Sequence, residues 1–280
     1  MGRYRTDIIV CDTTSRVAWN CTRSFAPGQG SCLFQMTGGS GGTCQTGNMG
    51  SGNCCAWVVP AGVTSVIIEL WGGGGGGGGS PGVCFCCYNG SGGGGGAYSR
   101  KTLTGLTAGT VYTVCAGAGG FGGGIEGGMS ANGCCCGKKG STTFVTGAGL
   151  SNFCADGGYG GESRCQHWFT GSFGFGGFPG TGGDLNVRGY DGGVMRNTGP
   201  DCWDNGWTWG GGSPFGGRHM YMAGQCDTSG DICGNGKHGS ACGQTGNFPG
   251  GGGTGGGFMT NCAACHCGGN GAAGLVRIWM

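Results

Sequence analysis

Apolar residues gather in a few short stretches of this chain, and their pattern predicts β-strands. The densest stretch, residues 65–71 (SVIIELW), is rich in β-branched residues, which pack well on a pleated sheet. Residues 110–115 and 274–280 are similar, and weaker alternation predicts further strands at 6–11, 17–22, 33–36, 56–60, 96–103 and 141–146. No stretch has sustained helical periodicity. The predicted fold is therefore all-β, with almost no helix.

The order of these strands predicts how they pair. Turn-forming sequences follow the strands at 56–60 and 96–103, so we expect residues 56–116 to form an antiparallel meander. An apolar strand close to the C-terminus of a chain commonly completes a sheet. We therefore place residues 274–280 beside residues 65–71.

The strand at 65–71 leads directly into eight consecutive glycines, residues 72–79. Gly accounts for 80 of the 280 residues, without the strict three-residue period and abundant Pro of collagen. Aromatic residues make up 10% of the chain and charged residues only 9%, a composition unlike that of a flexible linker or a disordered chain. The glycine runs are therefore either a linker or a packed structure, and this composition favours the packed one.

A packed structure of this kind is a lattice of polyglycine II helices. Such a helix has three residues per turn and no internal hydrogen bonds, so its N–H and C=O groups must bond to neighbouring chains. We predict a small antiparallel sheet or sandwich combined with such a lattice, joined by many long loops. The predicted lattice runs are bounded by Gly72, Gly79, Gly92, Gly96, Gly250 and Gly253, and residues 255–257 are a further run. Phe121, Phe173, Phe175, Phe178 and Phe258 are expected at the surface of the lattice or against the sheet.

Two regions are expected along the chain. Residues 1–55 contain widely spaced cysteines and predict an attachment or cap region, while residues 56–280 form a glycine-rich domain. Within that domain, about 150–245 is expected to be a variable loop insertion.

The 22 cysteines allow three interpretations. Disulfides would stabilise a protein whose side-chain core is small. A structural zinc ion, which needs about four ligands, has weak candidates in Cys84, Cys87, Cys262, Cys265, His266 and Cys267. Free, buried thiols are the third possibility. We favour disulfides and expect no cofactor.

Catalysis is not expected from this sequence. Its 12 acidic residues and four histidines (His167, His219, His238 and His266) form no recognised catalytic arrangement. No apolar run approaches the roughly 20 residues of a membrane helix, and no signal peptide is visible. Membrane insertion is therefore not expected. The net charge of only +2 gives no reason to predict binding to nucleic acid or to an anionic membrane surface.

Aromatic residues between 165 and 222 are the best candidates for binding. They are Trp203, Trp207, Trp209, His167, Trp168 and Tyr221. Aromatic faces among small polar residues suit the binding of a glycan or a protein surface. The same side chains could instead cover the lattice as its side-chain core. The sequence leaves both interpretations open.

Several segments of the chain together resemble a known family. Residues 57–74 (WVVPAGVTSVIIELWGGG), together with Ala97-Tyr98-Ser99, Tyr112-Thr113-Val114 and the closing residues 274–278, are similar to the glycine-rich domain of bacteriophage tail-fibre and adhesin proteins. The resemblance covers roughly residues 56–280. It implies a virion structural protein, most simply a tail-fibre or tail-tip adhesin for host-surface recognition.

The resemblance also implies partners and a location. The partners would be other tail or capsid proteins and a host receptor, either a glycan or an outer-membrane protein, and a homotrimer is the expected oligomer. The location would be the virion. A capsid decoration or capsid fibre protein is the alternative. A disulfide- or metal-stapled extracellular scaffold is a second alternative.

Overall fold

The structure is a computed structural model that describes residues 32–37, 52–79, 90–124, 136–162, 173–195, 207–223, 243–256 and 267–279. Within these residues every regular element is a β-strand, and every strand pairing is antiparallel. The predicted all-β class is confirmed.

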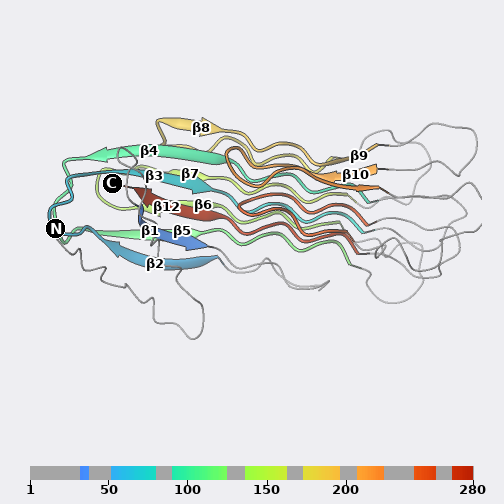
Figure 1. The fold of residues 1–280 in the computed structure, drawn as a ribbon, viewed down its shortest axis with the longest axis horizontal. Coiled ribbons are helices and arrows are strands. Elements are labelled where there is room, and N and C mark those ends of the chain that lie inside the picture. The colour runs from blue at the N-terminus through green and yellow to red at the C-terminus, as the bar shows by residue number, and fades with distance from the viewer. Residues whose placement is uncertain are drawn as a thin grey trace, which may run out of the picture.

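Two sheets form a sandwich at one end of the molecule (Figure 1). The larger, sheet A, has the order β1 (Cys32–Thr37), β12 (Leu275–Trp279), β3 (Ser65–Trp71), β4 (Tyr98–Thr104), β8 (Leu185–Val187). The smaller, sheet B, has the order β2 (Asn53–Val58), β5 (Val111–Ala116), β6 (Thr143–Thr146), β7 (Phe153–Ala155).

The predicted place of the C-terminal strand is confirmed, since β12 pairs with β3 over its whole length. The predicted meander over residues 56–116 is wrong, because β2 and β5 pair with each other in the sheet opposite β3 and β4. The physical reason is burial. Strands β2 to β5 each have one apolar face, and two facing sheets bury all of these faces in one core.

That core is made by alternate residues of both sheets. Ile68 and Leu70 of β3 and Val114 of β5 are all fully buried. The rings of Trp57 and Tyr112 lie 5.6 Å apart in the same cluster. Burial of these side chains stabilises the sandwich in the ordinary way.

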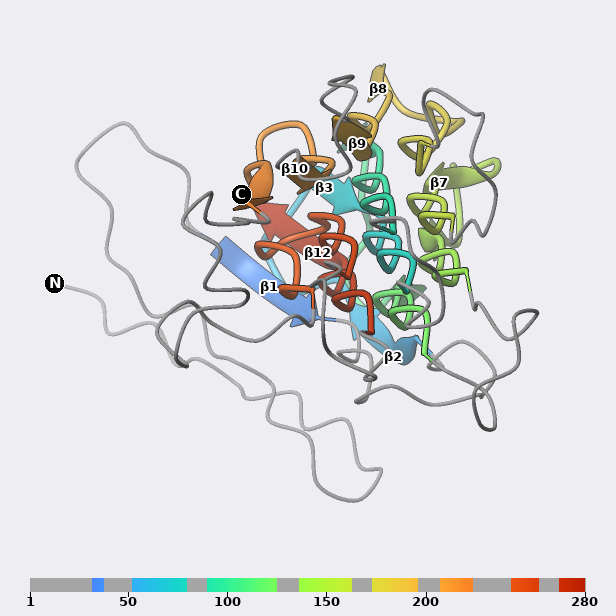
Figure 2. The ribbon, with the colours of Figure 1, turned by 90° about the vertical axis from the view of Figure 1, so that its right-hand side faces the viewer.

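Beyond the sandwich the chain continues as glycine-rich segments that run side by side away from the sheets (Figure 1). Viewed end-on in Figure 2, these segments are tight windings packed against one another. We call them the glycine bundle, which comprises residues 72–79, 90–97, 117–124, 136–142, 156–162, 173–180, 188–194, 207–213, 243–246, 250–256 and 267–274.

A third, small sheet lies within the far part of the bundle (Figure 1). It has the order β11 (Met220–Ala223), β10 (Trp207–Gly210), β9 (Gly193–Met195). The sequence pattern did not predict these strands. The range expected as one variable insertion, about 150–245, contains β7 to β11 and several bundle segments among its described residues.

The N-terminal part of the chain also contributes to the sandwich. The strand expected at 33–36 is found as β1, and it pairs with β12. The strands expected at 6–11 and 17–22 lie outside the described residues.

Candidate functional site

The run at residues 72–79 lies at the centre of the glycine bundle, and its amides bond in a repeat of three. Its first, fourth and seventh N–H groups donate to carbonyls of residues 90–97. The second and fifth donate to residues 136–142, and the third and sixth to residues 267–274. All seven distances are 2.8–3.0 Å. These seven amides therefore point to neighbouring segments of the chain and not to solvent.

The carbonyls of the same run are bonded just as regularly. Those of residues 73–78 accept N–H groups, at 2.8–2.9 Å, from residues 156–162, 117–124 and 250–256. The run thus has six neighbouring segments, three that accept from it and three that donate to it. The expectation that it bonds other glycine segments is met. A repeat of three is that of a polyglycine II helix, but assignment to that helix type stays a prediction.

Close approach explains why these positions are glycine. A Cβ built at any position from Gly72 to Gly77 would lie 1.9–2.1 Å from a backbone carbonyl oxygen of a neighbouring segment. Real Cβ atoms essentially never approach within 3.0 Å. Gly92, Gly96 and Gly253 are equally close to a neighbouring carbonyl, at 1.7–2.1 Å. Any larger residue would force the backbones apart and break the hydrogen bonds.

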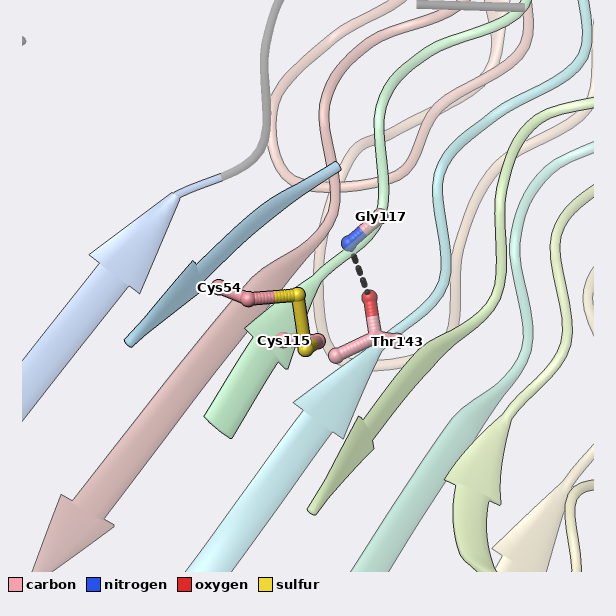
Figure 3. The surroundings of a disulfide bond; sticks show 4 residues. All are labelled: Cys54, Cys115, Gly117 and Thr143. Atoms are coloured by element: carbon pink, nitrogen blue, oxygen red, sulfur yellow. Dashed lines mark hydrogen bonds between the residues drawn. A yellow bond between two sulfur atoms is a disulfide. The ribbon is translucent and has the colours of Figure 1, made fainter. Parts of the chain in front are cut away.

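The bundle is joined to the sandwich by buried polar contacts near a disulfide (Figure 3). Cys54 and Cys115 are paired residues of β2 and β5, with Cα atoms 4.1 Å apart, and are disulfide-bonded. Two residues after Cys115, Gly117 donates its N–H to Oγ1 of Thr143 at 2.9 Å. The disulfide and this hydrogen bond hold the strands of sheet B together where the bundle begins.

The described cysteines differ in state. Cys267 is disulfide-bonded, as are Cys54 and Cys115, whereas Cys136 and Cys154 are thiols. Among the described residues no group of side chains is arranged to hold a metal ion. The remaining zinc candidates, Cys84, Cys87, Cys262, Cys265 and His266, lie outside the described residues. Disulfide bonding, the favoured interpretation, is thus found at Cys54, Cys115 and Cys267. Cys267 is therefore not the zinc ligand that the weaker alternative allowed, and nothing tests that alternative at the other positions.

The described segments of the bundle end together at one end of the molecule. Those that run away from the sandwich end at residues 79, 124, 162, 195, 223 and 256, and those that run back begin at residues 90, 136, 173, 207, 243 and 267 (Figure 1). We call this end, opposite the sandwich, the insertion end, and the six stretches of sequence between these residues the insertions.

Three of the predicted receptor-binding residues lie in the small sheet. Trp209 of β10 pairs with Gly193 of β9 and with Tyr221 of β11. Trp207 lies two residues before Trp209 on β10. The structure thus brings Trp207, Trp209 and Tyr221 together on the part of the bundle close to the insertion end (Figure 1). Trp203, His167 and Trp168 lie outside the described residues.

One flank of the bundle carries exposed aromatic rings. Phe173, Phe175 and Phe178 are 43–53% exposed, so they lie at the surface of the glycine bundle, which agrees with one of the two places expected for them. Phe121 is half-buried, and Phe258 lies outside the described residues. Tyr190, 54% exposed, was not singled out from the sequence. Because a lone Tyr among glycines and polar residues has no distinctive pattern, only its position in the bundle reveals it.

A ladder of rings and cations crosses this flank. Nζ of Lys139 lies 4.2 Å above the ring of Tyr159, whose ring meets that of Phe178 edge-on at 5.6 Å. Arg188 completes the ladder at 5.8 Å from the Phe178 ring. Burial by itself would lower the pKa of Lys139, but its hydrogen bond and ion pair with Asp156 outweigh this and raise that pKa. These contacts link four segments of the bundle, so the role of the ladder is to stabilise the packing of these segments.

The comparison with known families agrees with this architecture. A family model described as a glycine-rich domain matches residues 49–280. The chain belongs to the glycine-rich domain family. No curated protein is similar enough to count as a match to this glycine-rich domain protein. Its described residues include no helix long and apolar enough to cross a membrane.

Proposed function

We propose that this glycine-rich domain protein is a bacteriophage virion structural protein, a tail-fibre or tail-tip adhesin that recognises the host surface. The observation that carries the proposal is that the described segments of the bundle end together. Six outgoing segments end, and six returning segments begin, at the end opposite the sandwich. Such a molecule can present many variable stretches of chain together.

The bundle suits this role because it is rigid and independent of what the insertions contain. Its stability comes from backbone hydrogen bonds between segments, so insertions can vary without changing the core. Glycine backbones packed this closely leave almost no side-chain volume to vary. A display scaffold needs this separation of a constant frame from variable ends.

Several copies on one particle would strengthen weak contacts. Linking binding sites raises the effective concentration of the second site, so avidity exceeds the affinity of one contact. A homotrimer attached to other virion proteins would give this multivalency. The host partner would be a surface glycan or an outer-membrane protein. In this proposal the chain is not an enzyme.

The test combines location with competition. Gold-labelled antibodies against the chain are expected to mark tail fibres or tail tips of intact particles. The purified full chain is expected to slow adsorption of those particles to the host, whereas heat-denatured protein is not. Labelling spread over the capsid with no effect on adsorption would overturn the adhesin proposal in favour of capsid decoration.

A further inference from the structure

We propose that the flank of the bundle around Gly193 is a binding site for a neutral oligosaccharide. The inference deepens the proposed function and rests on it for the source of the sugar, a host-surface glycan. It concerns a described surface formed by Trp209, Phe173, Tyr190, His219 and Gly193, which we call the aromatic flank site.

The first part of the site is a bare backbone between two rings. A Cβ built on Gly193 would lie 2.6 Å from Cζ2 of Trp209 and 3.0 Å from Cδ1 of Phe173. Both rings therefore contact the backbone of Gly193, and no side chain rises between them. Phe173 is 43% exposed and Trp209 is half-buried. The two rings thus cover the backbone of Gly193 and form one apolar platform.

A second ring pair continues the platform toward the sandwich. The ring of Tyr190 lies 5.3 Å from that of His219, whose Nδ1 accepts the N–H of Gly212 at 3.3 Å. Tyr190 precedes Gly193 by three residues, and Gly212 follows Trp209 by three. With about 3.1 Å per residue, the two ring pairs are roughly 9 Å apart along the bundle. Two aromatic steps in line suit an elongated ligand.

The chemistry of the platform favours a neutral sugar. The flat apolar faces of sugar rings stack on aromatic side chains, while Tyr and Trp also carry a polar group for hydrogen bonding. Arg188 and Asp191, the charged residues of the Tyr190 segment, are paired with each other at 2.6 Å. An ionic ligand would have to compete with that pair, whereas a neutral oligosaccharide would not.

The rings are not needed to fill the bundle. The 54% exposure of Tyr190 means that about half of its surface faces solvent, and its segment is held by backbone bonds such as Tyr190 N–H to Gly212 C=O at 3.0 Å. Exposed aromatic side chains gathered on one surface commonly mark a binding site. This distinguishes Tyr190 from Tyr98, which is 3% exposed and packs inside a cluster.

The experiment measures sugar binding by the full chain. Neutral O-chain polysaccharides released from bacterial lipopolysaccharide, and dextran, are passed over the immobilised protein. At least one of these polysaccharides is expected to bind, and Tyr190→Ala and Trp209→Ala are each expected to weaken that binding about tenfold or more. Phe215→Ala is the matched control. Phe215 is also an exposed aromatic residue, at 73%, but it lies outside the aromatic flank site, where it packs against Tyr98 near the sandwich. This variant is expected to bind like the wild type.

The outcomes separate this inference from the proposed function. If no neutral polysaccharide binds, or if binding survives in both Tyr190→Ala and Trp209→Ala, the aromatic flank site is overturned. Inhibition of adsorption by the same protein would then still support an adhesin that recognises protein. Sugar binding lost in the two variants without any effect on adsorption would instead support the site and overturn the adhesin. Thermal unfolding of each variant checks folding, and the exposed Tyr190 keeps the test valid if Trp209→Ala does not fold.

Discussion

The side-chain hydroxyl of Thr143 donates a hydrogen bond of 2.6 Å to the backbone carbonyl of Trp71. Trp71 is the last residue of β3 in sheet A, and Thr143 is the first of β6 in sheet B. The same hydroxyl accepts the N–H of Gly117 (Figure 3). One fully buried side chain therefore joins the two sheets where the glycine bundle begins.

Thr143→Val tests this junction. Valine has the same shape but leaves the Trp71 carbonyl and the Gly117 N–H buried without this partner, and each loss costs about 1–3 kcal/mol. We expect the free energy of unfolding to fall by roughly 2–6 kcal/mol, measured by urea titration. Thr146→Val, an exposed change on the same strand, should shift it by less than about 0.5 kcal/mol. Equal effects of the two substitutions would contradict the junction.

The close packing of the bundle predicts a large difference between two glycines. At Gly75 a Cβ would lie 2.1 Å from the carbonyl oxygen of Tyr159, whereas at Gly149, in an open turn with φ +75°, it would meet nothing within 4 Å. We expect Gly75→Ala to abolish soluble folded protein. Gly149→Ala should cost only about 1–2 kcal/mol of left-handed backbone strain. Soluble yield and thermal unfolding measure both, and a wild-type melting curve for Gly75→Ala would refute the packing.

The stability of the sandwich should fall at alkaline pH. Burial, together with a 2.7 Å hydrogen bond to Glu69, raises the pKa of Tyr98 well above its usual range, and burial also raises the pKa of Tyr112. Above about pH 10 the unfolded chain loses these protons while the folded chain keeps them. Stability is therefore complete below that pH. As the pH rises further, each tyrosine lowers the free energy of unfolding by up to about 1.4 kcal/mol per pH unit, until the pH passes its folded-state pKa.

Two variants separate the tyrosines. Tyr98→Phe should remove the part of the loss of unfolding free energy at alkaline pH that Tyr98 causes. Tyr112→Phe should leave that part in place. Denaturant titrations from neutral pH to about pH 12 give the slopes. A slope that is unchanged in Tyr98→Phe would show that Tyr98 ionises alike in both states.

The disulfide of sheet B should contribute measurably to stability. Cys54 and Cys115 are 61 residues apart in sequence, and closing a loop of this length restricts the unfolded chain. Replacing both by Ala should lower the free energy of unfolding by about 2–4 kcal/mol. Cys136→Ser, at an exposed thiol, is the control and should have little effect. A double variant as stable as the wild type would assign the stability to the backbone network alone.

Much of the sandwich could be predicted because side chains specify it. The β-branched pattern of residues 65–71 and the apolar C-terminal strand predicted β3, β12 and their pairing. The facing of β2 and β5 against β3 and β4 could not be predicted. Each strand has an apolar face that a meander or a sandwich would bury equally well, and only the shared core decides between them.

For the glycine bundle the division is sharper. The sequence by itself determined that a long glycine run must form hydrogen bonds with other segments, because its amides have no partners within the run. It could not determine which segments of the chain are the partners. Every glycine in residues 72–79 offers the same N–H and C=O, and none has a side chain to set a register. Only the tertiary structure decided that, because the order of strands in the sandwich fixes where each segment starts. The same order brings the described bundle segments to a common end and sets Trp209 against Gly193.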